Sequence, residues 1–335
     1  MAYLVTGAAG FIGFHVALRL LQLGHDVVGF DDMNPYYDPA LKRARVAELV
    51  AHRGFRMVEA DLADRAAVEA VFSQPFAAVI HLAAQAGVRH GIDQPHVYAA
   101  ANLTGFLHIL EGCRHGRVPH LVYASSSSVY GSGQLPFSEH DAADHPLSLY
   151  AATKRANELM AHSYAHLFGL PATGLRFFTV YGPWGRPDMA IYKFTRALLA
   201  DEPIVLFNHG AMSRDMTYID DVVEAVIRVI DRPPTSVPVP DLATAAAPWR
   251  LYNVGNADPV DLMTLVATIE AATGRTAKTQ HAPLAAGDAI ATAADATDLF
   301  EAVGFRPATP LAEGVRRFVA WYRSYHGLPE RPSRA

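Results

Sequence analysis

A tyrosine and a lysine four residues apart, Tyr150 and Lys154, have the types and spacing to move a proton. Side chains at positions i and i+4 share one face of a helix. A phenol with a pKa near 10 is only about 0.1% ionised at neutral pH, so a tyrosine base needs its pKa lowered by roughly three units, about 4 kcal/mol of preference for phenolate. The ammonium of Lys154 favours the phenolate. The pair predicts a base that takes a proton from a hydroxyl group, although the spacing alone is common and needs support from other residues.

A row of serine hydroxyls, residues 125–128, follows a strand predicted at residues 120–125. One serine in such a place is explained by capping of the strand end, but four in a row favour binding of a polar substrate. We predict that Ser126 shares the reacting oxygen of the substrate with Tyr150. The predicted catalytic set is therefore Tyr150, Lys154 and Ser126.

A glycine-rich turn near the start of the sequence, with Gly7, Gly10 and Gly13, predicts a dinucleotide site. It lies between an apolar strand at residues 2–6 and an amphipathic helix. Glycine is needed where the backbone turns sharply, approaches a pyrophosphate or packs a helix on a strand, and a helix N-terminus attracts phosphate. The spacing differs from the usual G-x-G-x-x-G, so the position between strand and helix carries the prediction.

A carboxylate, Asp31, ends the second predicted strand. At this place it accepts hydrogen bonds from both hydroxyls of an adenosine ribose and repels a 2′-phosphate, so Asp31 favours NAD over NADP. Small residues after the fourth strand let a cofactor lie close. The predicted NAD site comprises Gly7, Gly10, Phe11, Ile12, Gly13, Asp31, Asp32, Asn34, Asp61, Leu62, Leu82, Ala83, Ala84, Gln85, Asn102, Ser125, Tyr150, Lys154 and Phe177.

A parallel sheet would bring these residues together, because ligands bind at the C-terminal ends of its strands. Apolar strands alternate with helices through the first half of the chain, which is the βαβ signature of such a sheet. We predict an α/β fold with a Rossmann-type doubly wound parallel sheet in residues 1–178. Residues 179–330 are predicted to form mainly a smaller α/β substrate-binding lobe, with some segments returning to the first domain. The predicted strands are 2–6, 26–30, 56–60, 77–82, 120–125 and 172–178, and one helix is predicted over 95–112.

The second half has shorter and mixed elements. Residues 179–189, rich in proline, glycine and aromatic side chains, predict an irregular binding loop. Residues 232–248 predict a mobile surface loop, a helix is predicted to begin at Pro259, and the tail after Gly327 is expected to fray.

The composition narrows the class of protein. The chain has 335 residues, 51% hydrophobic and 18% charged, so we expect a large core and little disorder. A net charge of −5 without a basic stripe argues against nucleic acid and membranes as partners. The 16 histidines lack metal-ligand spacing, so we predict no metal. One cysteine, Cys113, and no signal peptide or apolar run of spanning length predict a cytoplasmic protein.

The motifs together resemble those of the extended short-chain dehydrogenase/reductases that act on nucleotide sugars. Within that family, residues 36–39, 85–89 and 176–189 look most like those of UDP-glucuronate 4-epimerases. The resemblance covers nearly the whole chain. It implies a tightly held NAD+, a UDP-sugar in the cleft and a homodimer formed through the helices around Asn102 and Tyr150.

The implied reaction is reversible C4 epimerisation of UDP-glucuronate to UDP-galacturonate through a transient 4-keto sugar. A buried carboxylate without donors is very costly. We predict that Ser127, Ser128 and Thr179 donate to it, with Arg89 and Arg186 as nearby charged candidates. Adaptable hydroxyls suit a carboxylate that must turn with the ring, and must not be lost as CO2, better than one bidentate arginine does. Family positions assign Asn208, Arg214 and Asp288 to UDP, with Arg214 at the diphosphate and Asp288 at the uridine ribose.

Competing reactions in this family have visible markers. Nucleotide-sugar 4,6-dehydratases carry an Asp-Glu pair where this chain has Ser127 and Ser128, and UDP-glucuronate decarboxylases carry a Glu in the same stretch. UDP-glucose 4-epimerase and UDP-glucuronate decarboxylase remain the alternative enzymes, of which the decarboxylase is disfavoured by the missing acid. A non-catalytic NAD-sensing regulator usually loses the tyrosine or the lysine, and this chain has both.

Overall fold

A seven-stranded parallel sheet, in the order β10-β6-β5-β4-β1-β2-β3, forms the core of the computed structural model, which describes residues 1–285 and 287–329. Strands β2 and β6 are buried along their whole length, as expected for a parallel sheet covered on both faces. The arrangement confirms the predicted doubly wound α/β fold. The strands are β1 Ala2–Thr6, β2 Val27–Asp31, β3 Phe55–Glu59, β4 Phe76–His81, β5 Leu121–Ser126, β6 Ala172–Phe177 and β10 Trp249–Val254.

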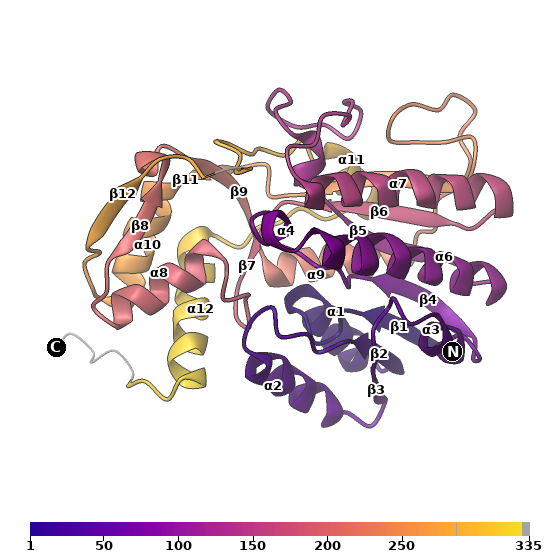
Figure 1. Ribbon diagram of the computed structural model, residues 1–335, viewed down its shortest axis with the longest axis horizontal. Coiled ribbons are helices and arrows are strands. Elements are labelled where there is room, and N and C mark those ends of the chain that lie inside the picture. Colours follow the sequence, from indigo (N-terminus) through magenta and orange to yellow (C-terminus); the bar gives the residue numbers. More distant parts are fainter. Residues whose placement is uncertain (286, 330–335) are drawn as a thin grey trace.

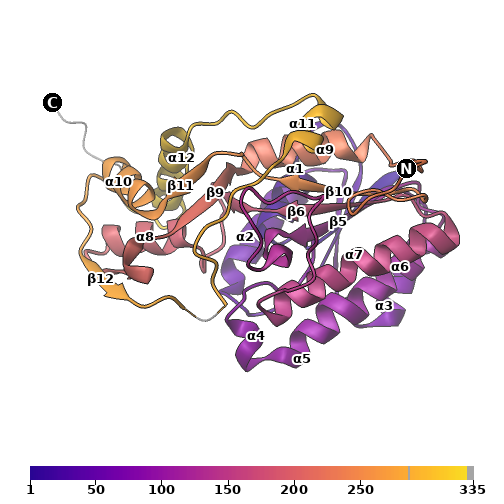
Figure 2. The same ribbon diagram turned by 90° about the horizontal axis from the view of Figure 1, so that it is seen from above.

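Helices cover both faces of this sheet, with α1 and α9 packed together on one face and α3, α6 and α7 on the other (Figures 1 and 2). Helix α7 begins after Ser148, whose hydroxyl accepts a hydrogen bond from the Ala151 N–H, and ends at Gly169 in the left-handed conformation. The Ser148 cap fixes the first turn of α7, which carries Tyr150. The helices are α1 Phe11–Gln22, α2 Pro39–Val50, α3 Arg65–Val71, α6 Gly105–His115, α7 Leu149–Phe168, α9 Ile219–Ile230 and α11 Thr297–Val303.

A smaller lobe lies beside the sheet, at the left of Figure 1. It holds a three-stranded sheet in the order β11-β9-β7 and the parallel pair β8 and β12. Strand β10 comes between two segments of this lobe in the chain but belongs to the large sheet, where it pairs with β6. The remaining elements are β7 Thr179–Tyr181, α8 Ala190–Leu199, β8 Ile204–Phe207, β9 Ser213–Tyr218, β11 Pro259–Asp261, α10 Leu262–Thr273, β12 Thr279–Ala282 and α12 Leu311–Tyr325.

Short strands in this lobe depart from the prediction. The segment predicted to be irregular opens with β7, because residues 179–181 pair in parallel with β9. Pro259 begins strand β11, which pairs with β9, and the helix starts only at Leu262. Strand β12 was not predicted. Each short strand is stabilised by a partner far away in the chain, which local propensity does not reveal.

The helix predicted over residues 95–112 is confirmed as a continuous helical run that contains a π-helical turn and extends to His115. The chain forms α4 His90–Asp93, α5 Pro95–Tyr98 and a π-helical turn, η1 Ala99–Thr104, before α6. The loop at residues 232–248 has no helix or regular strand, but Ala243 and Ala245 are buried in the core, so it does not lie wholly on the surface. In the described ranges no helix is both long and apolar enough to cross a membrane. Residues 330–335, in the tail predicted to fray and at the end of the predicted second lobe, lie outside the described residues.

Candidate active site

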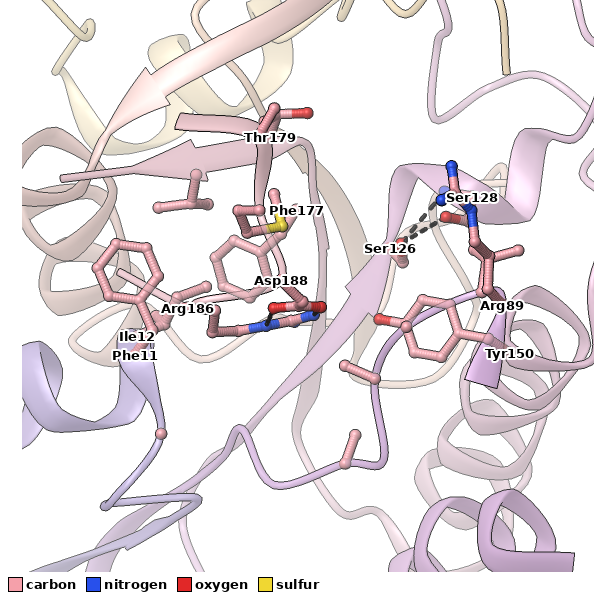
Figure 3. Close-up of a pocket in the computed structure, with 18 of the residues that line it drawn as sticks. Phe11, Ile12, Arg89, Ser126, Ser128, Tyr150, Phe177, Thr179, Arg186 and Asp188 are labelled. Carbon is pink, nitrogen blue, oxygen red and sulfur yellow. Dashed lines mark hydrogen bonds and ion pairs between the residues drawn. The ribbon is translucent and has the colours of Figure 1, made fainter. Parts of the chain in front are cut away.

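A cavity of about 960 Å³ opens at the C-terminal ends of the large sheet and extends to the smaller lobe. It is lined by every residue that the sequence predicted for the site except Asn102 and Asn208. Figure 3 shows Tyr150 on one side, the turn with Phe11 and Ile12 on another, and Thr179 and Phe177 between them. The sheet therefore gathers residues from both halves of the chain around one space.

The three glycines of the turn have no room for a side chain. Gly7 has φ +73°, and a Cβ on Gly13 would lie 2.0 Å from the Gly7 carbonyl oxygen. The first turn of α1 also receives no side-chain cap. Its amide groups can therefore meet an outside anion, and the turn fits a dinucleotide pyrophosphate.

Asp31 is buried at the end of β2 and is held by three donors. Its oxygens accept hydrogen bonds from the Ala9 and Met33 amides, and the Lys42 ammonium lies 3.3 Å from Oδ1. Burial raises the pKa of Asp31, while Lys42 opposes the rise. Lys42, on α2, was not predicted, because a lysine in a charged amphipathic helix gives no sign that it is buried. The Asp31 carboxylate is thus placed where a ribose would be bound.

Replacing Asp31 with Ser should shift cofactor preference toward NADP. The change removes the charge that repels a 2′-phosphate and leaves the Lys42 ammonium to attract one. We expect NAD+ affinity to fall by about tenfold or more, from the loss of a charge-assisted contact, while NADP+ affinity rises. Titrating cofactor-free protein with each nucleotide measures both constants, and an unchanged ratio of the two would contradict the role of Asp31.

Two cations, Lys154 and Arg186, line the cavity together with Tyr150. The Lys154 ammonium donates to the Ala124 carbonyl oxygen at 3.0 Å, and burial lowers the pKa of Lys154 to about 8. The effect of Lys154 on Tyr150 stays a prediction. Burial raises the pKa of Tyr150, opposed first by the Arg186 guanidinium and then by a hydrogen bond with Ser126. Arg186 is thus a second cation close to Tyr150, beside its predicted place near the substrate carboxylate.

A buried ion pair supports this part of the site from behind. Arg176 donates from Nε and Nη2 to the two carboxylate oxygens of Glu158, each at 2.8 Å. Ser125 also donates to Glu158, at 2.6 Å. Although Ser125 lines the cavity, its proton points to Glu158 rather than to a ligand. This network connects α7 to β5 and β6 below the catalytic residues.

The remaining hydroxyls face the cavity, but the predicted arginines are already paired. Ser126 donates to Ser128 at 3.2 Å, at the start of the short helix η2 Ser127–Tyr130, and Thr179 lies across from them on β7 (Figure 3). Arg89 forms an ion pair with Asp288 at 2.7 Å. Arg186 is gripped by Asp188. Which of these hydroxyls and arginines would hold a sugar carboxylate stays a prediction.

Arg214 lines the cavity while it holds a neighbouring segment. Its guanidinium donates to three backbone carbonyls, those of Ser213, Ala289 and Ile290. Burial lowers the pKa of Arg214, and Asp288 opposes the shift. The proposed contact of Arg214 with a diphosphate stays a prediction.

Two predicted residues lie outside the cavity lining. Asn102, in η1, accepts a hydrogen bond from the Gln85 amide at 2.8 Å and donates to the Gln85 carbonyl at 3.1 Å, so it holds the loop after β4 from below. Asn208 donates to the Ala211 carbonyl within a turn. Asn102 would act on a cofactor through Gln85, and direct UDP contact by Asn208 stays a prediction.

The cavity and its tyrosine–lysine pair define a nucleotide-linked oxidoreductase site, and the comparisons agree with that class. The pattern that defines the NAD dependent epimerase/dehydratase family matches residues 3–245, so the chain belongs to this family. It is 51% identical to a Rhizobium meliloti (strain 1021) protein named "Probable UDP-glucuronate 4-epimerase", over 96% of this chain and 97% of the relative. It is 46% identical to UDP-glucuronate 4-epimerase 3 of Arabidopsis thaliana, over 96% of this chain and 76% of that one.

A comparison with solved structures finds the same fold in a relative that was crystallised with its ligands. The structure of UDP-glucuronic acid 4-epimerase from Bacillus cereus, in complex with UDP-glucuronic acid and NAD, superposes with a TM-score of 0.88 at 28% identity. The match covers 97% of this chain and 100% of the other.

Proposed function

We propose that the protein interconverts UDP-glucuronate and UDP-galacturonate by epimerisation at C4 of the sugar, with NAD+ as its cofactor. One observation carries the proposal: Tyr150 and the hydroxyls of Ser126, Ser127 and Ser128 line the same cavity as the glycine turn. Serines occupy the positions at which related dehydratases and decarboxylases carry acids. Full-length relatives named as UDP-glucuronate 4-epimerases support the choice of substrate.

Tyr150 acts as the general base in this reaction and returns the proton in its second half. NAD+, held at the glycine turn and Asp31, would supply the reversible hydride acceptor for C4 that the side chains lack. Ser126 holds the 4-oxygen beside Tyr150. Ser127, Ser128 and Thr179 hold the carboxylate while the 4-keto ring turns. Because these donors are short and separate, the carboxylate can follow the ring without losing every hydrogen bond at once.

Incubation of the purified protein with UDP-glucuronate and NAD+ tests this function. UDP-galacturonate as the product, identified by chromatography and NMR, is the expected result. UDP-xylose with release of CO2 would identify a decarboxylase, and turnover of UDP-glucose alone would identify a neutral-hexose epimerase. Binding of NAD+ without turnover of any UDP-sugar would indicate the regulator.

We also propose that the protein is a homodimer built on α6 and α7. These helices lie side by side on one face (Figure 2), and Leu107 and Leu159 on them are 40% and 56% exposed. Exposed apolar side chains on two adjacent helices favour a four-helix interface with a second copy.

Replacing Leu159 with Glu should convert the dimer to a monomer. A charge at the centre of an apolar helix interface is left without a partner when it is buried. Analytical ultracentrifugation should show the wild type at twice the mass of the variant. Leu328→Glu, in the C-terminal segment at 38% exposure, is the matched control that should remain dimeric. A monomeric wild type would refute the proposed dimer.

A further inference from the structure

An ion pair faces the Tyr150 hydroxyl across the cavity (Figure 3). Arg186 donates from Nε to Oδ1 of Asp188 at 3.0 Å and from Nη2 to Oδ2 at 2.5 Å. Both residues follow β7 and line the cavity. The bidentate geometry fixes the plane of the guanidinium and occupies the edge with which an arginine usually grips a carboxylate.

A tyrosine from the other side of the molecule holds this pair. The Tyr36 hydroxyl donates to Oδ2 of Asp188 at 3.2 Å, and Tyr36 comes from the segment between β2 and α2. Its ring packs against His90, with 5.0 Å between centroids. Gly87 leaves the room that the hydroxyl needs, because a Cβ there would lie 2.2 Å from it. Tyr36 is therefore held on two sides while it holds Asp188.

Few titratable groups face Tyr150. From the segment after β7 come Arg186 and Asp188, from β5 comes Ser126, and from α5 comes Tyr98, whose ring centroid lies 6.4 Å from that of Tyr150. His90 stands beyond Tyr98 at 6.1 Å. Lys154, on the same helix as Tyr150, is turned to the Ala124 carbonyl. Among the cations that line this cavity, Lys154, Arg89 and Arg186, Arg186 is the one that Asp188 holds on both Nε and Nη2.

We propose that Asp188 is a positioning residue of the epimerase reaction: its carboxylate grips Arg186, is itself held by Tyr36, and sets how much positive charge faces Tyr150. The inference rests on the proposed function, in which Tyr150 is the base. The pair engages the Nε and Nη2 donors of Arg186, so the Ser127, Ser128 and Thr179 hydroxyls are the uncharged donors left to hold the sugar carboxylate. One group of residues thus sets the charge that faces Tyr150, and another group binds the sugar carboxylate.

Charge changes at this pair should move the pH profile in opposite directions. Tyr150 acts as phenolate, so kcat/KM falls on the acid side as the phenolate is protonated. Asp188→Asn leaves Arg186 uncompensated, favours the phenolate and should move the acid limb down by about one pH unit. Arg186→Gln should move the limb up by a similar amount. The double variant, which loses both charges, should return close to the wild-type position.

Tyr36→Phe tests the outer contact with little risk to folding. It should move the limb in the same direction as Asp188→Asn but by a smaller step, because Asp188 then grips Arg186 less firmly. Tyr37→Phe is the matched control: its neighbouring hydroxyl accepts from Arg45 rather than contacting Asp188, and the limb should stay in place.

A direct titration keeps the inference testable where turnover is too slow. The tyrosinate absorbance of the NAD-loaded protein, with the Tyr150→Phe trace subtracted, reports the ionisation of Tyr150 itself. The midpoint should move down in Asp188→Asn and up in Arg186→Gln. Midpoints and limbs that stay at the wild-type position, or that move the same way in both variants, overturn the role of Asp188. Failure of the wild type to form UDP-galacturonate would instead overturn the proposed function.

Discussion

The Tyr150→Phe variant should lose epimerase turnover by about 10³-fold or more while it still binds UDP-glucuronate and NAD+. The expected loss follows from removal of the group that we propose takes the proton of the 4-hydroxyl, since general-base catalysis contributes about 10²–10⁴-fold. The ring itself remains, so its contact with Tyr98 and the shape of the cavity should persist. Initial rates of UDP-galacturonate formation and calorimetric affinities for UDP-glucuronate measure the two effects separately.

The same helix offers a matched control for this variant. Tyr164 lies on α7, and its hydroxyl donates to Glu111 at the surface, away from the cavity. Tyr164→Phe should retain turnover within about twofold, because only a surface hydrogen bond is lost. Equal losses in the two variants, or turnover of Tyr150→Phe within tenfold of wild type, would falsify the assignment of Tyr150 as the base.

The Gly13→Ala variant should lose bound NAD. Its new methyl group would lie 2.0 Å from the Gly7 carbonyl oxygen, and that neighbour is backbone, so only a shift of the whole turn can relieve the contact. Opening the turn moves the α1 amides away from the pyrophosphate. We expect NAD+ affinity to fall by about 10²-fold or more, because the backbone amides that donate to the phosphates are displaced. Cofactor content after denaturation, followed by absorbance, gives the result.

A glycine far from the cofactor separates this effect from a general loss of stability. Gly169 ends α7 at φ +66° with nothing within 4 Å of its added Cβ. Gly169→Ala should lower the free energy of unfolding by about 1 kcal/mol, because alanine is strained in the left-handed conformation. The variant protein should nevertheless keep its bound NAD. Equal NAD content in the two alanine variants contradicts the close approach at Gly13.

The parts of the site that the sequence predicted are those with local signatures. A glycine turn between strand and helix, an acid at a strand end and a helical tyrosine–lysine spacing each lie within a few consecutive residues, and each lines the cavity in the structure. The parallel sheet was predictable for a similar reason, since its strands are continuous apolar runs. Repeated alternation with helices leaves few other arrangements.

What the sequence did not reveal depends on partners far apart in the chain. Lys42 is buried because the chain folds it against Asp31, and Asp188 is coupled to Tyr36 across the molecule. Nothing local in the sequence distinguishes Glu158 and Arg176 from surface charges, but packing of α7 on β6 buries them as an ion pair. The direction of the Lys154 ammonium, toward Ala124 rather than Tyr150, likewise depends on the packing of α7 on β5. Helical spacing places two residues on one face but does not say where a long, flexible side chain ends.

The return of β10 to the large sheet has a consequence for evolution and engineering. The chain enters the smaller lobe at β7, comes back for α9 and β10, and leaves again at β11. A fragment cut after residue 178 would expose the backbone of β6 as an unpaired edge, which invites aggregation. Substrate specificity therefore cannot be exchanged between relatives as one contiguous cassette. A viable chimera must graft at least two separate stretches of the smaller lobe and leave β10 with its native sheet.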